Sequence, residues 1–305
     1  MGLKVNLYKN LKNFDLNVDF EIGNESLAIV GHSGSGKSMT LKMISGIESQ
    51  DRGEIILNNK DITNTRVQER KVGFLFQNFG LFPHLSVINN ILLPLRNKDK
   101  NFAMELLKRF KVDSLANSYP NEISGGEKQR VALARLFSIN PEIILLDEPF
   151  SSLDTHLKWD IENDLNLFLQ NYNKPMVCVT HNIDEAMRMC KKILVLKSGK
   201  QVFFGSVDKI FEEPMNVELA KIVGVLNIFE DKLLGFYEDK FSTDKIEDSF
   251  EFNVEYKYDM KDSKGNLFVF KLENGNFIKC RLNLNNGQEV KKLYYSKDKA
   301  LKLKR

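Results

Sequence analysis

The chain has no long apolar segment. Although 42% of its 305 residues are hydrophobic, apolar runs such as residues 143–146 and 28–30 end after a few positions. A membrane-spanning helix needs about 20 mostly apolar residues, so the sequence predicts none. The first residues also lack the apolar stretch of a signal peptide. We therefore expect a protein that is cytosolic or that binds a membrane from its cytosolic side.

Cysteine and net charge are also scarce. Cys178, Cys190 and Cys280 are the only cysteines, and they do not have the spacing of metal ligands. We expect reduced and mostly buried thiols rather than disulfides or a zinc site. The formal net charge is only +3, which argues against the concentrated basic face that nucleic-acid binding requires. We therefore expect no nucleic-acid partner.

Short apolar strands alternate with helical periodicity over the first two thirds of the chain. The predicted strands are residues 16–22, 27–30, 54–57, 72–76, 142–147, 176–180 and 193–196. Residues from about 85 to 138 instead show helix periodicity, interrupted by Pro94 and Pro120. This pattern predicts an α/β core that carries a helical insert.

The pattern changes after about residue 230. Residues 251–260 alternate between polar and apolar, which predicts a half-buried strand. Asn274-Gly275 is a strong signal for a two-residue hairpin turn. We therefore expect a domain over residues 1–230, with a helical subdomain at about 85–138, and a small all-β domain over residues 231–305.

A glycine-rich segment joins the predicted strand at 27–30 to a predicted helix. It reads Gly31-His32-Ser33-Gly34-Ser35-Gly36-Lys37-Ser38, followed by Met39. Small residues allow backbone N–H groups to close around phosphate oxygens, and the start of the helix adds positive charge. In this frame Lys37 reaches the β- and γ-phosphates and Ser38 binds Mg²⁺. A chance match in a glycine-rich turn is disfavoured, because a strand precedes the segment and a helix follows it.

A second candidate site is the acidic end of an apolar strand. Residues 143–146 lead into Asp147 and Glu148. A buried strand of this kind places its last residues at the edge of the sheet where ligands of α/β proteins bind. We expect Asp147 to hold Mg²⁺ and Glu148 to polarise an attacking water. A strand with a solvated acidic end is the plainer alternative.

Ser124-Gly125-Gly126-Glu127 opens a predicted helix, and this second anion site has no lysine. Together with the phosphate loop and the Asp-Glu strand end, in this order, it resembles the ABC ATPase family. The signature of that family reads close to Leu-Ser-Gly-Gly-Gln, so Ile123 and Glu127 are mild departures. The resemblance covers residues 1 to about 230 and implies a phosphate-loop NTPase core of the RecA-like type.

The resemblance implies further roles, one position at a time. Gln77 corresponds to the glutamine that touches Mg²⁺ and water and senses the permease, and Asp154 to the loop that crosses the dimer interface. His181 corresponds to the histidine at the γ-phosphate, although taken alone it would be a packed or surface histidine. For the aromatic residue that stacks on adenine, Tyr8 is the candidate and Phe14 the alternative. ATP would then lie between the phosphate loop of one subunit and the Ser-Gly-Gly segment of another.

The resemblance also implies partners and a location. The chain is similar to importer ATPases for molybdate, sulfate, polyamines, ferric iron and sugars, whose C-terminal module is an oligonucleotide-barrel-like regulatory domain. We expect a homodimer on the cytoplasmic face of the membrane, working with permease subunits and an extracytoplasmic substrate-binding protein. Residues 11–20 resemble the molybdate branch, so molybdate or a related oxyanion is the expected substrate. An exporter ATPase or a soluble ABC protein is the alternative, and the β domain could simply stabilise the dimer.

Residues 78–85, directly after Gln77, are unusually apolar for a loop. An exposed apolar patch on such a protein often marks a partner site. The resemblance implies a groove here that receives a short cytoplasmic helix of the permease. The alternative is that Phe79, Leu81, Phe82 and Leu85 pack the helical insert against the core.

Overall fold

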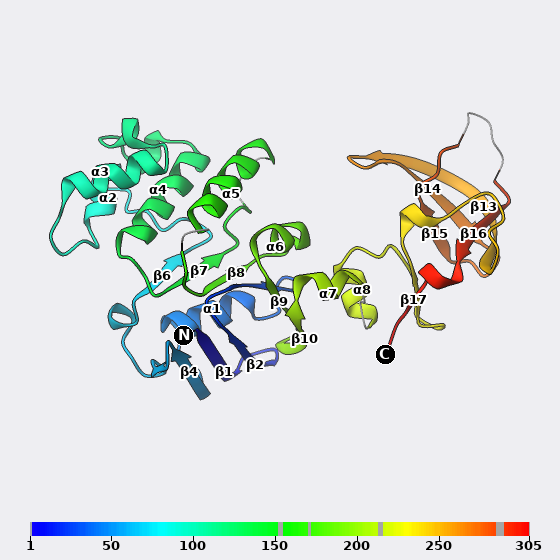
Figure 1. Cartoon of the computed structure of the whole chain (residues 1–305), viewed down its shortest axis with the longest axis horizontal. Coiled ribbons are helices and arrows are strands. Elements are labelled where there is room, and N and C mark those ends of the chain that lie inside the picture. The colour runs from blue at the N-terminus through cyan, green and yellow to red at the C-terminus, as the bar shows by residue number, and fades with distance from the viewer. Residues whose placement is uncertain (1, 152–154, 170–171, 213–215, 285–289, 305) are drawn as a thin grey trace. The chain divides into compact units, whose positions relative to one another are not determined.

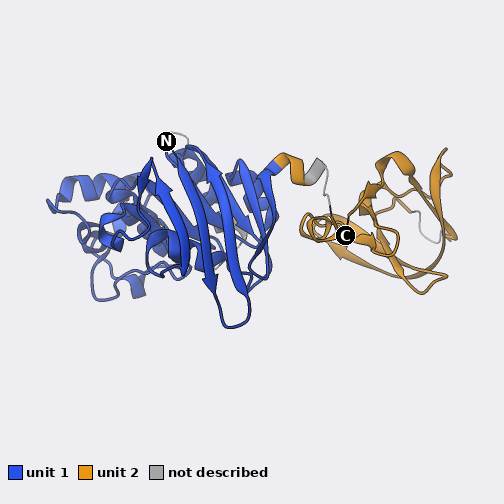
Figure 2. Ribbon diagram, turned by 90° about the horizontal axis from the view of Figure 1, so that it is seen from below, with its two compact units in different colours: residues 1–207 blue, residues 208–305 orange. Residues whose placement is uncertain are grey.

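The computed structural model describes residues 2–151, 155–169, 172–212, 216–284 and 290–304. The chain forms two compact units, residues 1–207 and 208–305 (Figure 2). Each unit has an apolar core of its own. The sequence places the domain boundary near residue 230 instead. The segment between these two positions belongs to the second unit in packing, because Ala220 shares a small core with Val225 and Leu303.

Unit 1 is built on one mixed sheet with the strand order β5-β4-β1-β2-β10-β9-β3-β8-β7-β6. Its strands are β1 (Leu3–Asn10), β2 (Asp15–Ile22), β3 (Ser26–Val30), β4 (Arg52–Leu57), β5 (Lys60–Asp61), β6 (Val72–Leu75), β7 (Ile143–Asp147), β8 (Met176–Val179), β9 (Lys192–Lys197) and β10 (Lys200–Ser206). The strands β3, β9, β8, β7 and β6 run parallel to one another, whereas β1, β2, β4 and β5 pair antiparallel.

Helices cover this sheet and form a separate cluster at one end of unit 1 (Figure 1). The helices of the chain are α1 (Lys37–Ser45), α2 (Val87–Leu92), α3 (Lys100–Arg109), α4 (Gly125–Ser138), α5 (Thr155–Leu169), α6 (Ile183–Met189), α7 (Val207–Glu212) and α8 (Val217–Ile222). The helices α2, α3 and α4 contact one another and form the cluster. The predicted helical insert is thus present as three helices joined by turns.

Four parallel strands bring the candidate residues to one edge of the sheet. The strands β3, β6, β7 and β8 are neighbours or near neighbours in parallel register. Their carboxyl ends lead into the phosphate loop, Gln77, Glu148 and His181 respectively. The carboxyl edge of parallel strands is where α/β sheets bind ligands. The topology therefore gathers residues that are more than a hundred positions apart in sequence.

Unit 2 consists of small antiparallel sheets, in the orders β11-β12-β17 and β15-β14-β13-β16. Its strands are β11 (Asn227–Phe229), β12 (Leu234–Phe236), β13 (Ser249–Asp262), β14 (Gly265–Leu272), β15 (Phe277–Cys280), β16 (Lys292–Ser296) and β17 (Leu301–Lys302). The predicted hairpin at Asn274-Gly275 joins β14 to β15. The prediction of a half-buried strand at 251–260 is wrong for its second half. Tyr256, Tyr258 and Met260 are 48%, 50% and 43% exposed, because this end of β13 extends beyond the core.

Candidate nucleotide-binding site

The loop between β3 and α1 requires glycine for steric reasons. Gly36, the residue before α1, has a φ of 104°, a left-handed value that favours glycine. A Cβ atom on Gly31 would lie 2.1 Å from the carbonyl oxygen of Leu196 on β9. The loop therefore presents bare backbone to the start of α1. Backbone N–H groups at a helix start form an anion site.

Lys37 folds back over this loop. Its ammonium donates to the carbonyl oxygens of Gly31 at 2.9 Å and His32 at 3.0 Å. Burial lowers the pKa of Lys37, and the carboxylates of Glu148 and Asp147 act in the opposite direction. The buried cation is thus held by weak neutral acceptors, which a phosphate oxygen could replace with a stronger charge-assisted bond.

Ser38 and Asp147 meet next to the lysine. The Ser38 hydroxyl donates to Oδ1 of Asp147 at 2.7 Å, joining the first turn of α1 to the end of β7. Asp147 is 8% exposed. Burial raises the pKa of Asp147, the Ser38 hydrogen bond lowers it, and the nearby Glu148 carboxylate raises it further. The pair supplies hard oxygen ligands of the kind that Mg²⁺ prefers.

Glu148 and His181 lie side by side at the ends of β7 and β8. Nδ1 of His181 is 3.3 Å from Oε2 of Glu148. Glu148 has a φ of 46°, which is uncommon for a residue other than glycine. Its backbone is held in this conformation because its N–H donates to Val179 and its carbonyl accepts from Ser151. Strained backbone of this kind is concentrated at functional sites.

The phosphate loop, Lys37, Ser38 and Glu148 face a cleft of about 570 Å³, whereas Asp147 and His181 do not line it. It is lined by Leu11, Lys12, Asn13, Phe14, Ser33, Gly34, Gly36, Lys37, Ser38, Met39, Lys42, Gln77 and Glu148. Gln77, which follows β6, lines the same cleft as the phosphate loop. Phe14 lines the cleft, whereas Tyr8 does not and instead carries the guanidinium of Arg52 at 4.2 Å from its ring centroid.

Ser124 lies elsewhere on the surface, at the start of α4. Its hydroxyl and its backbone N–H both donate to the carboxylate of Glu127 at 2.7 Å. In return the Ser124 hydroxyl accepts from the Glu127 N–H at 3.4 Å, so the two residues form a capping box. These hydrogen bonds lower the pKa of Glu127. Ser124 and Gly125 are exposed, Gly126 is buried, and none of them lines the cleft.

Comparison with known proteins identifies the family. Residues 14–151 match the ABC transporter family profile. A probable sulfate/thiosulfate import ATP-binding protein of Chlorella vulgaris is 38% identical over 68% of this chain and 91% of its own length. A molybdate/tungstate import ATP-binding protein of Archaeoglobus fulgidus is 38% identical over 75% of this chain and 96% of its own length. This chain belongs to the ATP-binding proteins of ABC transporters. It is an ABC-type ATPase that binds ATP, on the importer side of the family.

Other relatives agree with this assignment. A spermidine/putrescine import ATP-binding protein of Vibrio vulnificus is 37% identical over 71% of this chain, although the match spans only 59% of that relative. A dimeric ATP-binding cassette bound to ADP and phosphate has the same fold, with a TM-score of 0.60 and 30% identity. It covers 67% of this chain and 98% of its own length. The ABC cassette therefore accounts for unit 1.

Some features of this ABC protein were not predicted from its sequence. Lys42 lines the cleft one helical turn after Ser38, and its charge lowers the pKa of Asp147. The i, i+4 spacing of Ser38 and Lys42 on α1 is a signal that could have indicated it. Asp154, predicted for the dimer loop, lies outside the described residues. No helix in the described part of the chain is long and apolar enough to cross a membrane.

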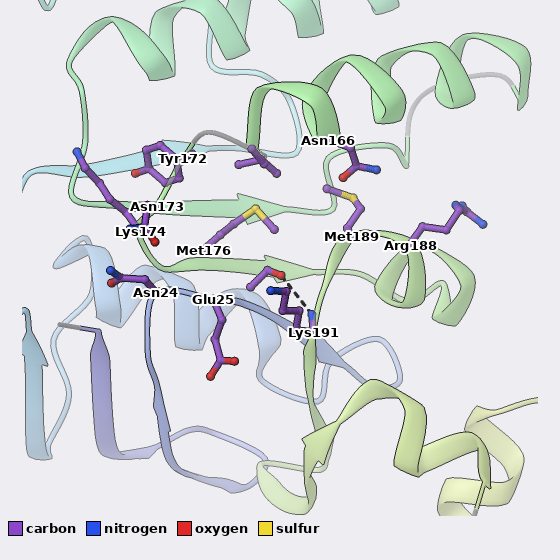
Figure 3. A pocket seen from close by; sticks show the side chains of 12 residues that line it. Asn24, Glu25, Asn166, Tyr172, Asn173, Lys174, Met176, Arg188, Met189 and Lys191 are labelled. Carbon is purple, nitrogen blue, oxygen red and sulfur yellow. Dashed lines mark hydrogen bonds between the residues drawn. The ribbon is translucent and has the colours of Figure 1, made fainter.

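A second pocket, of about 660 Å³, lies at the opposite edge of the sheet (Figure 3). Ser26 and Met176 at the amino ends of β3 and β8 line it, so it is remote from the phosphate loop. Two of its cations have partners: Lys174 donates to Pro141 and Asn140, and Arg188 pairs with Glu162. This pocket contains none of the candidate residues of the nucleotide site.

Proposed function

We propose that this chain is the ATP-hydrolysing subunit that powers an importer through a separate permease. The observation that carries this proposal is that Ser38 and Glu148 line one cleft with the phosphate loop, Asp147 is hydrogen-bonded to Ser38, and His181 contacts Glu148. Phosphoryl transfer depends on positioning and on charge stabilisation, and these residues supply both. Membership of the ABC ATP-binding family supports the same conclusion.

Each residue of the cleft has a proposed role. Lys37 and the N–H groups of the loop residues Gly31, His32, Ser33, Gly34, Ser35, Gly36, Ser38 and Met39 hold the phosphates. Glu148 polarises the attacking water, and His181 contacts the γ-phosphate. The 3.3 Å contact between Glu148 and His181 supports this pairing of roles, because it places the two side chains next to each other.

The residues of the cleft fit a magnesium ion. Ser38 and Asp147 already place a hydroxyl and a carboxylate oxygen 2.7 Å apart, and Gln77 lines the same cleft with an amide oxygen. Mg²⁺ takes oxygen ligands and usually keeps several waters, so three protein groups suffice. When bound, the ion neutralises phosphate charge. We propose that Ser38, Gln77 and Asp147 hold it directly or through water.

For the adenine ring, we propose Phe14 rather than Tyr8. Phe14 is partly buried against the core and lines the cleft. Tyr8 lies on β1 with its ring under Arg52, outside the cleft lining. An aromatic face worth about 1–3 kcal/mol in base stacking is therefore available on the loop between β1 and β2.

The working unit is proposed to be a homodimer. Ser124 and Gly125 are exposed and lie outside their own cleft, which is what a second subunit's nucleotide requires. Ser124, Gly125, Gly126 and Glu127 would meet the γ-phosphate bound to that subunit, and Asp154 would cross between the two. The dimeric cassette with 30% identity supports this arrangement.

The permease is proposed to dock in an apolar groove of about 580 Å³. Phe76, Gly80 and Phe82 line it from the loop that carries Gln77, and Leu93 and Ile139 line it from the helical cluster. Phe82, Leu93 and Ile139 are 40%, 46% and 41% exposed. The groove suits the apolar side of a short cytoplasmic helix. The subunit would thus work at the cytoplasmic face of the membrane, and the permease would receive its cargo from an extracytoplasmic binding protein.

The substrate is proposed to be an oxyanion, either molybdate or sulfate. In support, the relatives that are each 38% identical are a sulfate/thiosulfate and a molybdate/tungstate import protein, and both transport oxyanions by their names. A polyamine is the second candidate, because the spermidine/putrescine relative is 37% identical. Uptake of radiolabelled molybdate, sulfate and spermidine by cells with and without this chain would distinguish them.

Unit 2 is proposed to be a regulatory domain. We place the functional boundary at residue 230, with the nucleotide-binding domain over 1–230, its helical subdomain at 85–138, and the β domain over 231–305. In support, the cassette that matches unit 1 covers 98% of its own length without any counterpart for the rest of this chain.

Replacing Glu148 with glutamine tests the proposed chemistry. Glu148→Gln keeps the shape but removes the charge that polarises water, so steady-state turnover should fall by about 10²- to 10⁴-fold. ATP binding should persist, because the phosphate contacts remain, and gel filtration should show an ATP-dependent dimer. Glu142→Gln, at the other end of the same strand, is the matched control and should keep turnover. Wild-type turnover in Glu148→Gln would contradict the role.

A further inference from the structure

A partly buried arginine, Arg135, connects the loop after Gln77 to helix α4. Nη1 of Arg135 donates to the carbonyl oxygen of Gly80 at 2.8 Å, and Nη2 donates to that of Phe79 at 3.0 Å. Both nitrogens of the guanidinium fork are therefore used on adjacent carbonyls of one turn. The guanidinium carbon also lies 5.6 Å from the ring centroid of Phe82. No other side chain in the described residues bonds to either carbonyl.

The turn that Arg135 holds has an unfavourable backbone. Phe79 and Gly80 have φ values of 62° and 57°, so two successive residues are left-handed. For Phe79 this conformation costs energy, because its Cβ crowds the neighbouring carbonyl. Such conformations persist where surrounding contacts over-determine them. The guanidinium of Arg135 donates a hydrogen bond to each of these two residues at the same time.

The continuation of the loop is fixed from α2. Asn90 is fully buried, and its side-chain amide donates to the carbonyls of Phe82, Leu85 and Ser86. Its oxygen accepts from the Phe82 N–H at 2.9 Å. Since α2 packs against α4, the helical cluster holds this loop at Phe79, Gly80, Phe82, Leu85 and Ser86.

This attachment joins two functional surfaces of the same subunit. Gln77 lines the nucleotide cleft two residues before Phe79, and Ser124 caps the helix on which Arg135 lies. We propose that Arg135 is a positioning residue that makes the Gln77 loop and helix α4 move as one body. Nucleotide in a subunit's own cleft then orients the Ser124 surface that this subunit offers to the second subunit. This inference rests on the proposed function.

This role requires arginine, because a lysine ammonium cannot replace the two N–H groups that Arg135 directs at two carbonyls. A guanidinium is planar and presents parallel N–H donors to two acceptors, whereas an ammonium is a point charge on a flexible stem. Arg135→Lys should keep the charge and most of the packing but release one of the two carbonyls. A coupling free energy between two sites of a protein corresponds to a change of about 5- to 150-fold in affinity.

The test measures dimer formation driven by ATP, with all variants made in the Glu148→Gln background. The dimer dissociation constant at saturating ATP is measured by analytical ultracentrifugation, and the ATP affinity of the monomer by titration calorimetry. Arg135→Lys should weaken the dimer about tenfold. It should leave monomer affinity for ATP unchanged, because the phosphate loop is untouched. Asn90→Ala, which frees the same loop from α2, should act in the same direction.

Arg70→Lys is the matched control. Arg70 is buried and, like Arg135, donates to backbone carbonyls. Its acceptors lie outside the Gln77 loop and are those of Met43, Ile44, Thr63 and Thr65. It should lower the melting temperature without changing the dimer constant. The proposal is overturned if Arg135→Lys and Asn90→Ala dimerise as tightly as their parent, or if Arg70→Lys weakens the dimer equally. If the Glu148→Gln parent itself fails to dimerise with ATP, the proposed function fails first and this inference falls with it.

Discussion

Asp147 shows a conflict between stability and function in a single residue. Its carboxyl group is buried at the end of β7, and burial is the main reason that its pKa is raised. Lys37 and Lys42 offset this only in part, and the adjacent Glu148 adds repulsion. A buried carboxylate is tolerated in a fold when the protein needs its charge, and the proposed Mg²⁺ site supplies such a need. The left-handed backbone of Glu148 is a second such cost at the same point.

We predict that Asp147→Asn stabilises the nucleotide-free protein and abolishes its Mg²⁺-dependent ATPase activity. The folded-state pKa of Asp147 is raised, so its contribution to stability is present below the unfolded pKa and is lost as pH rises through the folded value. Asparagine cannot ionise, so this loss of stability does not occur, and its amide oxygen can still accept a hydrogen bond from the Ser38 hydroxyl. The melting temperature at pH 7.5 should rise by about 2 °C, which is roughly 1 kcal/mol for a domain of this size.

The pH dependence provides the check on this prediction. The difference in melting temperature between Asp147→Asn and the wild type should shrink as pH falls towards 4, since the wild-type carboxyl then becomes neutral. A thermal scan at several pH values measures it. An asparagine variant that melts below the wild type at pH 7.5 would show that the charged form of Asp147 is stabilising.

At the scale of elements, local patterns predicted those parts of the site that are contiguous in sequence. The phosphate loop and the Asp147 strand end follow from a glycine frame and an apolar run. The strand β1 was missed although Leu3, Val5 and Leu7 alternate and are buried, because its partners β2 and β4 lie later in the chain. Helix α8 was also missed, because it has only six residues and its stability comes from packing.

The contacts that join elements could not be predicted in this way. Nothing in the sequence near Arg135 indicates that it donates to Phe79 and Gly80. The choice of Phe14 over Tyr8 similarly depends on where the loop between β1 and β2 lies, not on spacing from Gly31. Such facts arise from tertiary packing, and a single sequence carries no direct record of it.

The apolar loop after Gln77 contains both core and surface residues, and substitution should separate them. Phe79 is 9% exposed and belongs to the core, whereas Phe82 is 40% exposed and lines the groove. Phe82→Ser should therefore leave the melting temperature and ATP affinity of the isolated subunit unchanged while abolishing co-purification with the permease. Phe79→Ser should destabilise the fold by about 3 kcal/mol or more.

Leu167→Ser is the control for the groove experiment. Leu167 is 61% exposed on α5 and does not line the groove, so its loss removes exposed apolar surface elsewhere. It should leave permease binding intact. If Phe82→Ser melts at a markedly lower temperature and loses ATP binding, Phe82 belongs to the core and the docking assignment is wrong.

At the scale of the whole molecule, each unit has its own core, and the relatives match mainly the first unit. The core of unit 1 draws its residues from β1 to β9, and that of unit 2 from β11 to β16. The three import proteins described above align over 68–75% of this chain, and the solved cassette covers 67% of it. The ATPase and the C-terminal unit can therefore be treated as two folding units on one chain.

We predict that residues 1–212 alone fold and retain ATP binding and basal hydrolysis. The cut follows α7 and leaves every described residue that lines the cleft in place. Because a domain with its own core unfolds cooperatively, the full chain should show two calorimetric transitions. The 1–212 fragment should reproduce one of them.

A chain that ends at residue 296 is the matched control, because it lacks β17 and Leu303, which pack in unit 2. It should lose only the other transition and keep full ATPase activity. A single transition in the full chain, together with a 1–212 fragment that neither folds nor binds ATP, would mean that the ATPase depends on the C-terminal unit for its stability.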